Sequence, residues 1–334
     1  MKKMKLRTKI IIWALAVLLI LYNVGVNVLI SAALKPEFMR KLDAFQRITD
    51  KSYSEMVRTD EITENTKLAR EEAKAFLEKA EGVKVTTQSR DGFKLIAQVF
   101  RQPEPKGKPW VILLHGYTGW KEEMYHYAAK YYDRGFNILC PDLRCQGESE
   151  GDFIGMGWTD RGDVMLWIDE ILGAYPEAEI VVHGESMGAS CALMLEGLDL
   201  PENVVCIISD CAMEDAMSMF RKQLRDWFGL PDIGLISTAR IWLILRGGYD
   251  LRDASALNEV SKGDVPILFI HGDQDRIVPV GDAKNLYEAF GSGEKEIMIV
   301  EGAGHAQSCY KDPDAYYDKV FGFIDRYLDP DSGL

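Results

Sequence analysis

The pentapeptide GESMG at residues 184–188 fits the pattern G-x-S-x-G, with Ser186 at its centre. An apolar run typical of a buried strand precedes it at residues 180–183, and a helix-forming stretch follows at residues 189–195. A strand, a tight turn and a helix in this order hold a serine hydroxyl exposed at the turn. A glycine-rich turn with a helix-capping serine would use the same residues, but the strand before the motif and the helix after it favour Ser186 as a nucleophile.

A serine hydroxyl is a weak nucleophile, so a nearby side chain must accept its proton. At strand–turn–helix serine sites the chain order is serine, acid, histidine, and of the five histidines only His271 and His305 follow Ser186. His271 ends an apolar run, whereas His305 lies in the glycine-rich segment 302–305 after the last predicted strand. A loop there can reach the serine, so we predict His305 as the general base. The alternative is an ordinary surface histidine.

The segment HGDQDRIVP at residues 271–279 supplies two candidates for the acid that orients the histidine. This acid holds the imidazole in the correct tautomer and stabilises its protonated form. We predict Asp275 for this role, because Asp273 is placed to brace the turn through its own backbone, as aspartate does in loops. Asp210, which follows the predicted strand 204–209, is a third candidate.

The oxyanion that forms during acyl transfer needs two backbone N–H donors. The residue after the nucleophile, Met187, is expected to supply one of them. The second is expected from the loop HGYTG at residues 115–119, where Tyr117 is the candidate. His115 in the same loop is predicted to be structural, because its position suits support of the oxyanion loop.

Short apolar runs alternate with helical stretches over most of the chain. Strands are predicted at residues 110–114, 136–140, 179–183, 204–209, 265–271 and 296–300, and two more, 83–89 and 93–101, flank the turn signal Asp91-Gly92. Uniformly apolar strands separated by helices indicate an α/β fold, with a mostly parallel sheet that helices cover on both faces. The initial hairpin adds antiparallel strands at one edge.

No strand is predicted between residues 210 and 265. The apolar residues in the first part of this interval have helical spacing: Met213, Met217, Phe220, Leu224 and Trp227. We therefore predict a helical cap at about residues 211–262, within a main domain that spans residues 82–334. Because the cap follows the carboxyl end of a strand, it is expected to cover the substrate site.

The N-terminal segment predicts a membrane anchor at residues 1–35. Five cations occur between Lys2 and Lys9, and residues 10–34 contain no charge, which exceeds the roughly 20 residues that a helix needs to cross a bilayer. Positive charge before the span predicts a single-pass protein of the cell membrane, with its catalytic domain outside the cytoplasm. Residues 31–33 (SAA) also resemble a cleavage site, so a removed signal peptide is the alternative.

Two further features accompany this segment. Residues 36–81 are predicted to form a helical juxtamembrane segment, in which Phe38, Leu42 and Phe45 have helical spacing. Asn23, Asn27 and Ser31 share one face of the predicted anchor helix. Polar side chains in lipid seek partners, so this stripe predicts weak self-association. The alternative is that the asparagines lie near water in a tilted helix.

The composition argues against other classes of partner. The net charge of −13 disfavours nucleic-acid binding, which needs a basic surface. The six cysteines are scattered without a C-x-x-C pair, and no cluster of histidine, cysteine and carboxylate has ligand spacing. We therefore expect neither a metal nor a cofactor.

Five segments, taken in order, resemble the α/β-hydrolase superfamily: HGYTG (115–119), PDLRCQGESEG (141–151), GESMG (184–188), HGDQDRIVP (271–279) and GAGH (302–305). Within it, the likeness is to membrane-anchored bacterial serine hydrolases related to acyl-peptidases and monoacylglycerol-lipase-like esterases. The resemblance implies hydrolysis of a small carboxylic ester through an acyl-enzyme, without a cofactor. A peptide or amide substrate, and a non-catalytic binding protein on the same fold, are the alternatives. The chain departs from the family pattern at Cys145, where the family has a glycine that tolerates positive φ.

Overall fold

The computed structural model of the chain describes residues 6–36, 56–291 and 293–330. Eight strands form one sheet in the order β1-β2-β4-β3-β5-β6-β7-β8. Their bounds are β1 Gly82–Gln88, β2 Lys94–Phe100, β3 Trp110–Leu114, β4 Asn137–Pro141, β5 Ile180–Glu185, β6 Val204–Asp210, β7 Ile267–Gly272 and β8 Lys295–Val300. The pairs β1–β2 and β2–β4 are antiparallel and the remaining pairs are parallel. The predicted fold class, with its antiparallel edge hairpin, is confirmed.

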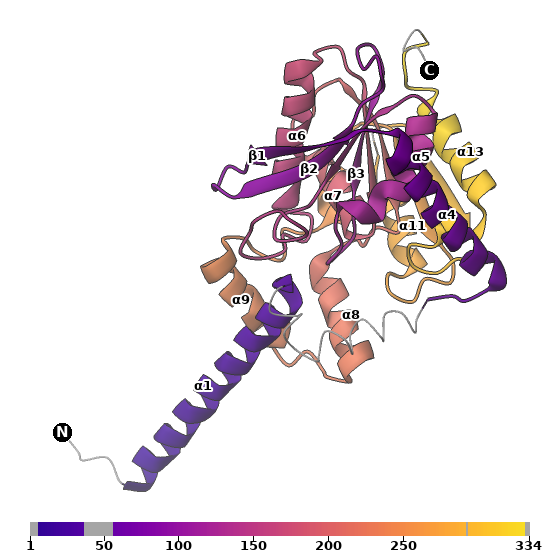
Figure 1. The fold of residues 1–334 in the computed structure, drawn as a ribbon. Coiled ribbons are helices and arrows are strands. Elements are labelled where there is room, and N and C mark those ends of the chain that lie inside the picture. The colour runs from indigo at the N-terminus through magenta and orange to yellow at the C-terminus, as the bar shows by residue number, and fades with distance from the viewer. Residues whose placement is uncertain (1–5, 37–55, 292, 331–334) are drawn as a thin grey trace.

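Helices cover both faces of the sheet (Figure 1). In β3, Val111 and Leu113 face one hydrophobic cluster while Ile112 and Leu114 face the other, which is why this strand is apolar at every position. One face carries α4 (Asp60–Lys79), α5 (Tyr125–Asp133) and α13 (Pro313–Ile324). The other carries α6 (Asp160–Ala174), α7 (Met187–Met194), α10 (Ala256–Val260) and α11 (Val280–Ala289). The sequence patterns did not predict α11.

The interval between β6 and β7 contains α8 (Ala216–Phe228), α9 (Leu235–Gly247) and α10. This interval is described in full and contains no strand, only an isolated bridge between Asp215 and Ser255. The Asp215 side chain caps α8 by accepting a hydrogen bond from the Ser218 backbone N–H, and Gly229 ends the helix in the left-handed conformation. The helical spacing of Met217 to Trp227 therefore corresponds to a real helix, whereas Met213 lies before its first residue.

A long apolar helix, α1 (Leu6–Leu34), precedes the sheet. Within the described residues it is the one helix long and apolar enough to cross a membrane; its most apolar window has a mean hydropathy of 2.2 and is 6% buried. Its C-terminal end packs on the main core through Val26, Ile30 and Leu34. The predictions that depend on Lys2, Phe38, Leu42 and Phe45 concern residues outside the described ranges.

The loop after β4 contains the departure noted at Cys145. This residue has φ +62°, so the backbone keeps the left-handed conformation that the family's glycine would adopt. Its backbone N–H donates to the Glu150 carbonyl at 3.0 Å, which closes the loop. A cysteine in this conformation is strained relative to glycine.

Candidate active site

The turn between β5 and α7 holds Ser186 in a strained backbone conformation, φ +55° and ψ −116°. The two flanking glycines are required by close packing. A Cβ on Gly184 would lie 2.2 Å from the Gly188 carbonyl oxygen, and one on Gly188 would lie 2.1 Å from the carbonyl oxygen of Leu114 in β3. The strand, the helix and the neighbouring strand therefore meet with no room for side chains, and the serine is held at the tip of the turn.

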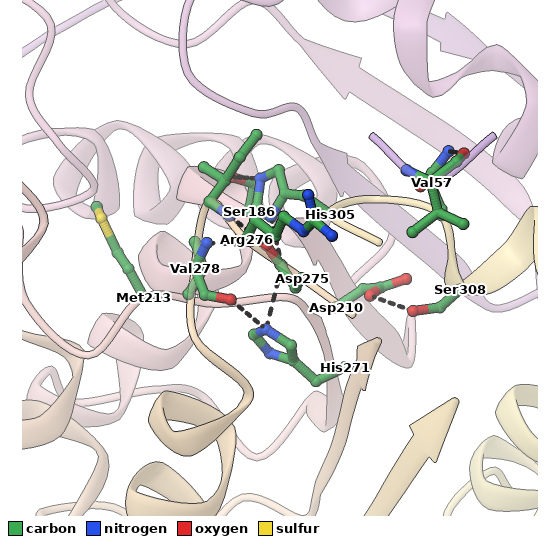
Figure 2. Close-up of polar contacts among 12 residues, drawn as sticks. Val57, Ser186, Asp210, Met213, His271, Asp275, Arg276, Val278, His305 and Ser308 are labelled. Atoms are coloured by element: carbon green, nitrogen blue, oxygen red, sulfur yellow. Dashed lines mark hydrogen bonds and ion pairs between the residues drawn. The ribbon is translucent and has the colours of Figure 1, made fainter. Parts of the chain in front are cut away.

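Three predicted residues from three loops come together here (Figure 2). The Ser186 Oγ lies 2.9 Å from Nε2 of His305, in the loop after β8. The Nδ1 of the same ring lies 2.7 Å from Oδ2 of Asp275, in the loop after β7. A carboxylate only accepts, so Nδ1 carries the hydrogen and Nε2 is free to accept the proton of the serine. The other oxygen of Asp275 accepts the backbone N–H groups of Ile277 at 2.8 Å and Val278 at 2.9 Å.

The electrostatics of the pair match this geometry. Burial alone would disfavour charge on Asp275, but the charge of His305 and the hydrogen bonds from His271 and His305 lower the pKa of this carboxyl below its usual range. Burial likewise disfavours charge on His305, but its ion pair and hydrogen bond with Asp275 outweigh that and raise its pKa above the ordinary value. The imidazolium form is therefore stabilised by a carboxylate that stays ionised.

The rival carboxylates have other partners. Asp273 accepts the Gly302 backbone N–H at 2.7 Å, a bracing role at the turn. Asp210 accepts the hydroxyls of Ser308 at 3.3 Å and Tyr316 at 2.9 Å. His271, whose Nε2 lies 3.0 Å from the Val278 carbonyl and 3.2 Å from Oδ2 of Asp275, must carry its hydrogen on Nε2 because a carbonyl only accepts. It therefore shares the Oδ2 oxygen of Asp275 with the imidazole of His305.

The loop after β3 lies against the nucleophile. A Cβ on Gly116 would lie 3.5 Å from Cβ of Ser186, so this loop borders the serine closely. His115 supports it: Nε2 accepts the Leu143 backbone N–H at 3.0 Å, and Nδ1 donates to the Gly116 carbonyl at 2.8 Å. Burial lowers the pKa of His115 to about 4, so it is neutral and structural. The two predicted oxyanion donors belong to these elements: Tyr117 lies in this loop, and Met187 is the first residue of α7, directly after Ser186.

Two features near the site were not predicted from the sequence. Gln307, two residues after His305, is held by a pair of hydrogen bonds with the backbone of Val57: it accepts the Val57 N–H at 3.0 Å and donates to the Val57 carbonyl at 3.0 Å. The segment before α4 therefore fixes the histidine loop. No local sequence pattern predicts this contact, because two residues far apart in the chain form it.

The second feature is a set of acidic side chains around the turn. Glu185, the residue before the nucleophile, accepts the Tyr127 hydroxyl at 3.2 Å. Burial, together with the carboxylates of Asp210 and Glu123, raises its pKa to about 8. Burial also raises the pKa of Glu123 to about 7. A glutamate inside G-x-S-x-G is the signal that would have drawn attention to this group.

One set of side chains has metal-ligand character among the described residues. A thiol, a carboxylate and an imidazole, from Cys211, Asp275 and His305, place their ligand atoms within 4.8 Å of one another. Burial, and then the nearby carboxylates, raise the pKa of the Cys211 thiol well above its usual value, so it stays protonated. A thiol is a poor ligand compared with a thiolate, and the other two groups already bond to each other. The arrangement suits proton transfer better than metal binding.

Comparison with known proteins identifies the family of the chain. The model of the alpha/beta hydrolase family matches residues 111–319. The YqkD protein of Bacillus subtilis (strain 168) is 31% identical over 220 residues, which cover 66% of this chain and 72% of that protein. Among solved structures, the Pyrococcus furiosus esterase Pf2001 superposes with a TM-score of 0.60 at 22% identity, over 75% of this chain and 94% of the esterase.

The Pyrococcus horikoshii acylaminoacyl peptidase superposes with a TM-score of 0.57 at 20% identity, over 76% of this chain but 43% of the peptidase. Identities at this level show a common fold and leave the reaction open. The match of the family model to most of the sheet and to the loops that carry Ser186, Asp275 and His305, together with the likeness to YqkD, shows that this chain belongs to the alpha/beta hydrolase family.

Proposed function

We propose that the chain is a serine hydrolase that cleaves carboxylic esters through an acyl-enzyme intermediate. The observation that carries the proposal is the continuous line of contacts from Ser186 Oγ through the His305 ring to Asp275, at 2.9 Å and 2.7 Å. A nucleophile, a base and an orienting acid at these distances form the arrangement that acyl transfer requires. A non-catalytic binding protein would not need all three groups at these distances.

In this mechanism Nε2 of His305 takes the hydroxyl proton as Ser186 attacks the ester carbonyl. The N–H groups of Met187 and Tyr117 are assigned to the resulting oxyanion. The imidazolium, stabilised by Asp275, then protonates the departing alcohol. Water attacks the acyl-enzyme with the same histidine as base, which releases the acid and restores the serine.

An ester is favoured over a peptide bond by the extent of the structural likeness. The esterase Pf2001 is matched along 94% of its length, whereas the peptidase is matched along 43%, so more than half of the peptidase has no counterpart in the superposition. Amide cleavage by the same residues is the second candidate, because the chemistry is shared.

The experiment is a substrate panel on purified full-length protein. p-Nitrophenyl esters of graded acyl length are compared with aminoacyl anilides, and a fluorophosphonate probe reports the reactive serine. Ester turnover with labelling that disappears in Ser186→Ala is expected. Labelling that survives this substitution would refute the nucleophile, and turnover of anilides alone would replace the esterase by an amidase.

The same proposal includes an uncleaved membrane anchor with the catalytic domain outside the cytoplasm. Its support is the docking of the C-terminal end of α1. The Ile154 backbone N–H donates to the Leu34 carbonyl at 2.9 Å, and the Tyr117 hydroxyl donates to the Ala33 carbonyl. Cleavage after Ala33 would remove the contact of Ala33 with Tyr117 and would leave Leu34 as the new N-terminus, without the helix that places it. Protease added to intact spheroplasts is expected to digest the domain, whereas a soluble, intact full-length chain in the cytoplasm would contradict the topology.

A further inference from the structure

The end of the cap exposes apolar side chains to an unusual degree. Six of them come from the end of α8, from the loop that follows it and from one side of α9. We call this set the cap tip: Phe228, Leu230, Ile233, Ile241, Ile244 and Leu245. Ile233 is 76% exposed and Leu245 is 70% exposed. An apolar patch of this kind on a water-soluble domain marks a surface that meets another apolar phase.

The cap tip adjoins α1. Figure 1 shows α9 beside the C-terminal half of α1, and three side-chain contacts fix the two helices together. The hydroxyls of Tyr22 and Thr238 form a hydrogen bond of 3.1 Å. The Trp242 indole donates to Asn23 at 3.0 Å, and the Arg246 guanidinium donates to Asn27 at 2.8 Å. The asparagine stripe of α1 thus bonds within the chain, and its self-association remains an untested prediction.

The position of these contacts along α1 sets their depth in a bilayer. If the span begins at Ile10, Asn23 lies about 20 Å and Asn27 about 26 Å from that boundary, at about 1.5 Å per residue. The hydrocarbon core is about 30 Å thick. Both asparagines therefore lie within its half nearer the catalytic domain, and helix α9, which bonds to them, lies at the same depth.

The direction of α9 agrees with this depth. Along the three contacts, residue numbers rise together in both helices, so the start of α9 lies deeper than its end. The cap-tip loop with Leu230 and Ile233 precedes α9 and contains the most exposed apolar side chain. At the shallow end, Arg246 lies where a cation reaches the headgroups. The carboxylates nearest the tip are paired, Asp232 with Arg221 at 3.0 Å and Asp226 with Lys222 at 3.2 Å.

We propose that the cap tip inserts into the bilayer leaflet on the side of the catalytic domain, and that the acyl ester enters the Ser186 site from this leaflet. The inference rests on the proposed function and on the proposed anchor. Both elements that enter the bilayer also border the site: the Lys222 ammonium of α8 donates to the Arg276 carbonyl beside Asp275 at 2.7 Å, and α1 ends against Tyr117. The substrate class is therefore an ester with an acyl chain that partitions into lipid.

An apolar groove gives such a chain a place beside the cap. It has a volume of about 600 Å³ and lies between α1 and α9; Leu19, Val24, Val28 and Trp242 are among its lining residues. Trp242, Tyr22 and Tyr117 all pack against the same hydrophobic cluster, so apolar contact continues from the groove toward the oxyanion loop.

The test uses full-length protein in vesicles of phosphatidylethanolamine and phosphatidylglycerol. Two substrates with the same chromophore are compared: p-nitrophenyl palmitate dissolved in the vesicles, and p-nitrophenyl acetate in water. Ile233→Glu is expected to lower palmitate turnover about tenfold or more, because a carboxylate resists transfer into hydrocarbon, and to leave acetate turnover unchanged. Leu68→Glu, at a 53% exposed apolar position of α4, is the matched control and is expected to change neither.

A depth measurement reads insertion independently of activity. A nitroxide is attached at Ile233→Cys or Leu68→Cys in a Cys145→Gly background, because Cys145 is the one cysteine of the six that is not buried. The label at 233 is expected to be accessible to oxygen and shielded from a water-soluble nickel chelate, and the label at 68 the reverse. A label at 233 that is exposed to the chelate would overturn insertion even with acetate turnover intact. If the unsubstituted protein does not hydrolyse p-nitrophenyl acetate, the proposed hydrolase function is refuted instead.

Discussion

Replacing Asp275 by asparagine exchanges one oxygen for an amide nitrogen, and the structure determines which one. Oδ1 accepts two backbone N–H groups, from Ile277 and Val278, at 2.8 Å and 2.9 Å. An amide nitrogen cannot accept them, so the amide oxygen must take this place. The nitrogen must then take the place of Oδ2, 2.7 Å from Nδ1 of His305.

The consequence is the wrong tautomer of the histidine. Nδ1 now accepts from the amide, so the hydrogen moves to Nε2, which no longer accepts the proton of Ser186. The Nε2–H of His271, 3.2 Å from the same position, would also face a donor in place of an acceptor. By analogy with an orienting aspartate replaced by its amide, kcat should fall about 10⁴-fold, or about 5.5 kcal/mol.

The assay is kcat on a short p-nitrophenyl ester, with Asp273→Asn as the matched control. Asparagine at 273 can still accept the Gly302 N–H through its amide oxygen, so the loss there should stay below about tenfold. Thermal melts of both variants separate loss of catalysis from loss of folding. An Asp275→Asn enzyme within tenfold of the unsubstituted protein, or the reverse ranking of the two variants, would refute the assignment of the acid.

Further outcomes follow from the same site. Ser186→Ala should lower kcat on the order of 10⁶-fold while thermal melting changes little, because members of a triad act as a unit; residual turnover above a hundredth would contradict it. Because the base must be neutral and the pKa of His305 is raised, kcat/KM should be full at high pH and be lost as pH falls through a value above about 6.5; a profile flat from pH 5 to 8 would exclude this base. EDTA should not alter turnover, since the Cys211 thiol stays protonated; restoration of an EDTA-treated enzyme by a divalent ion would reverse that conclusion. Phe228→Ala should shift acyl-chain preference and change the melting temperature little, because an exposed ring contributes little to the core; a large drop in stability with unchanged preference would assign the Phe228 ring to the core.

The sequence was sufficient to predict those features of the site that depend on a local motif or on the order of residues along the chain. The strand, turn and helix around Ser186 are local, and the positions of Asp275 and His305 follow from the order of loops at one edge of a parallel sheet. Even the choice between two aspartates two residues apart agrees with the geometry, because one carboxylate braces a turn and the other reaches the imidazole. The role of these residues in catalysis is still the proposal that the experiments above address.

The unpredicted features depend on contacts between distant parts of the chain. Asn23 and Trp242 are 219 residues apart, so an isolated apolar helix with two asparagines gave no indication that a cap helix covers them. Gln307 and Val57 are 250 residues apart. The raised pKa of Glu185 depends on its burial and on the carboxylates of Asp210 and Glu123, which only the folded sheet brings near it. Burial and pairing of this kind have no periodicity and no motif.

The separation of the reacting groups along the chain also affects biosynthesis. Ser186 and His305 are 119 residues apart, and the histidine loop is completed by elements that follow it, including Tyr316 of α13 against Asp210. Domains form from the N-terminal side during translation, so α1 leaves the ribosome long before the nucleophile has a base. During synthesis, the proposed nucleophile and base therefore come together only when β7, β8 and α13 have joined the sheet.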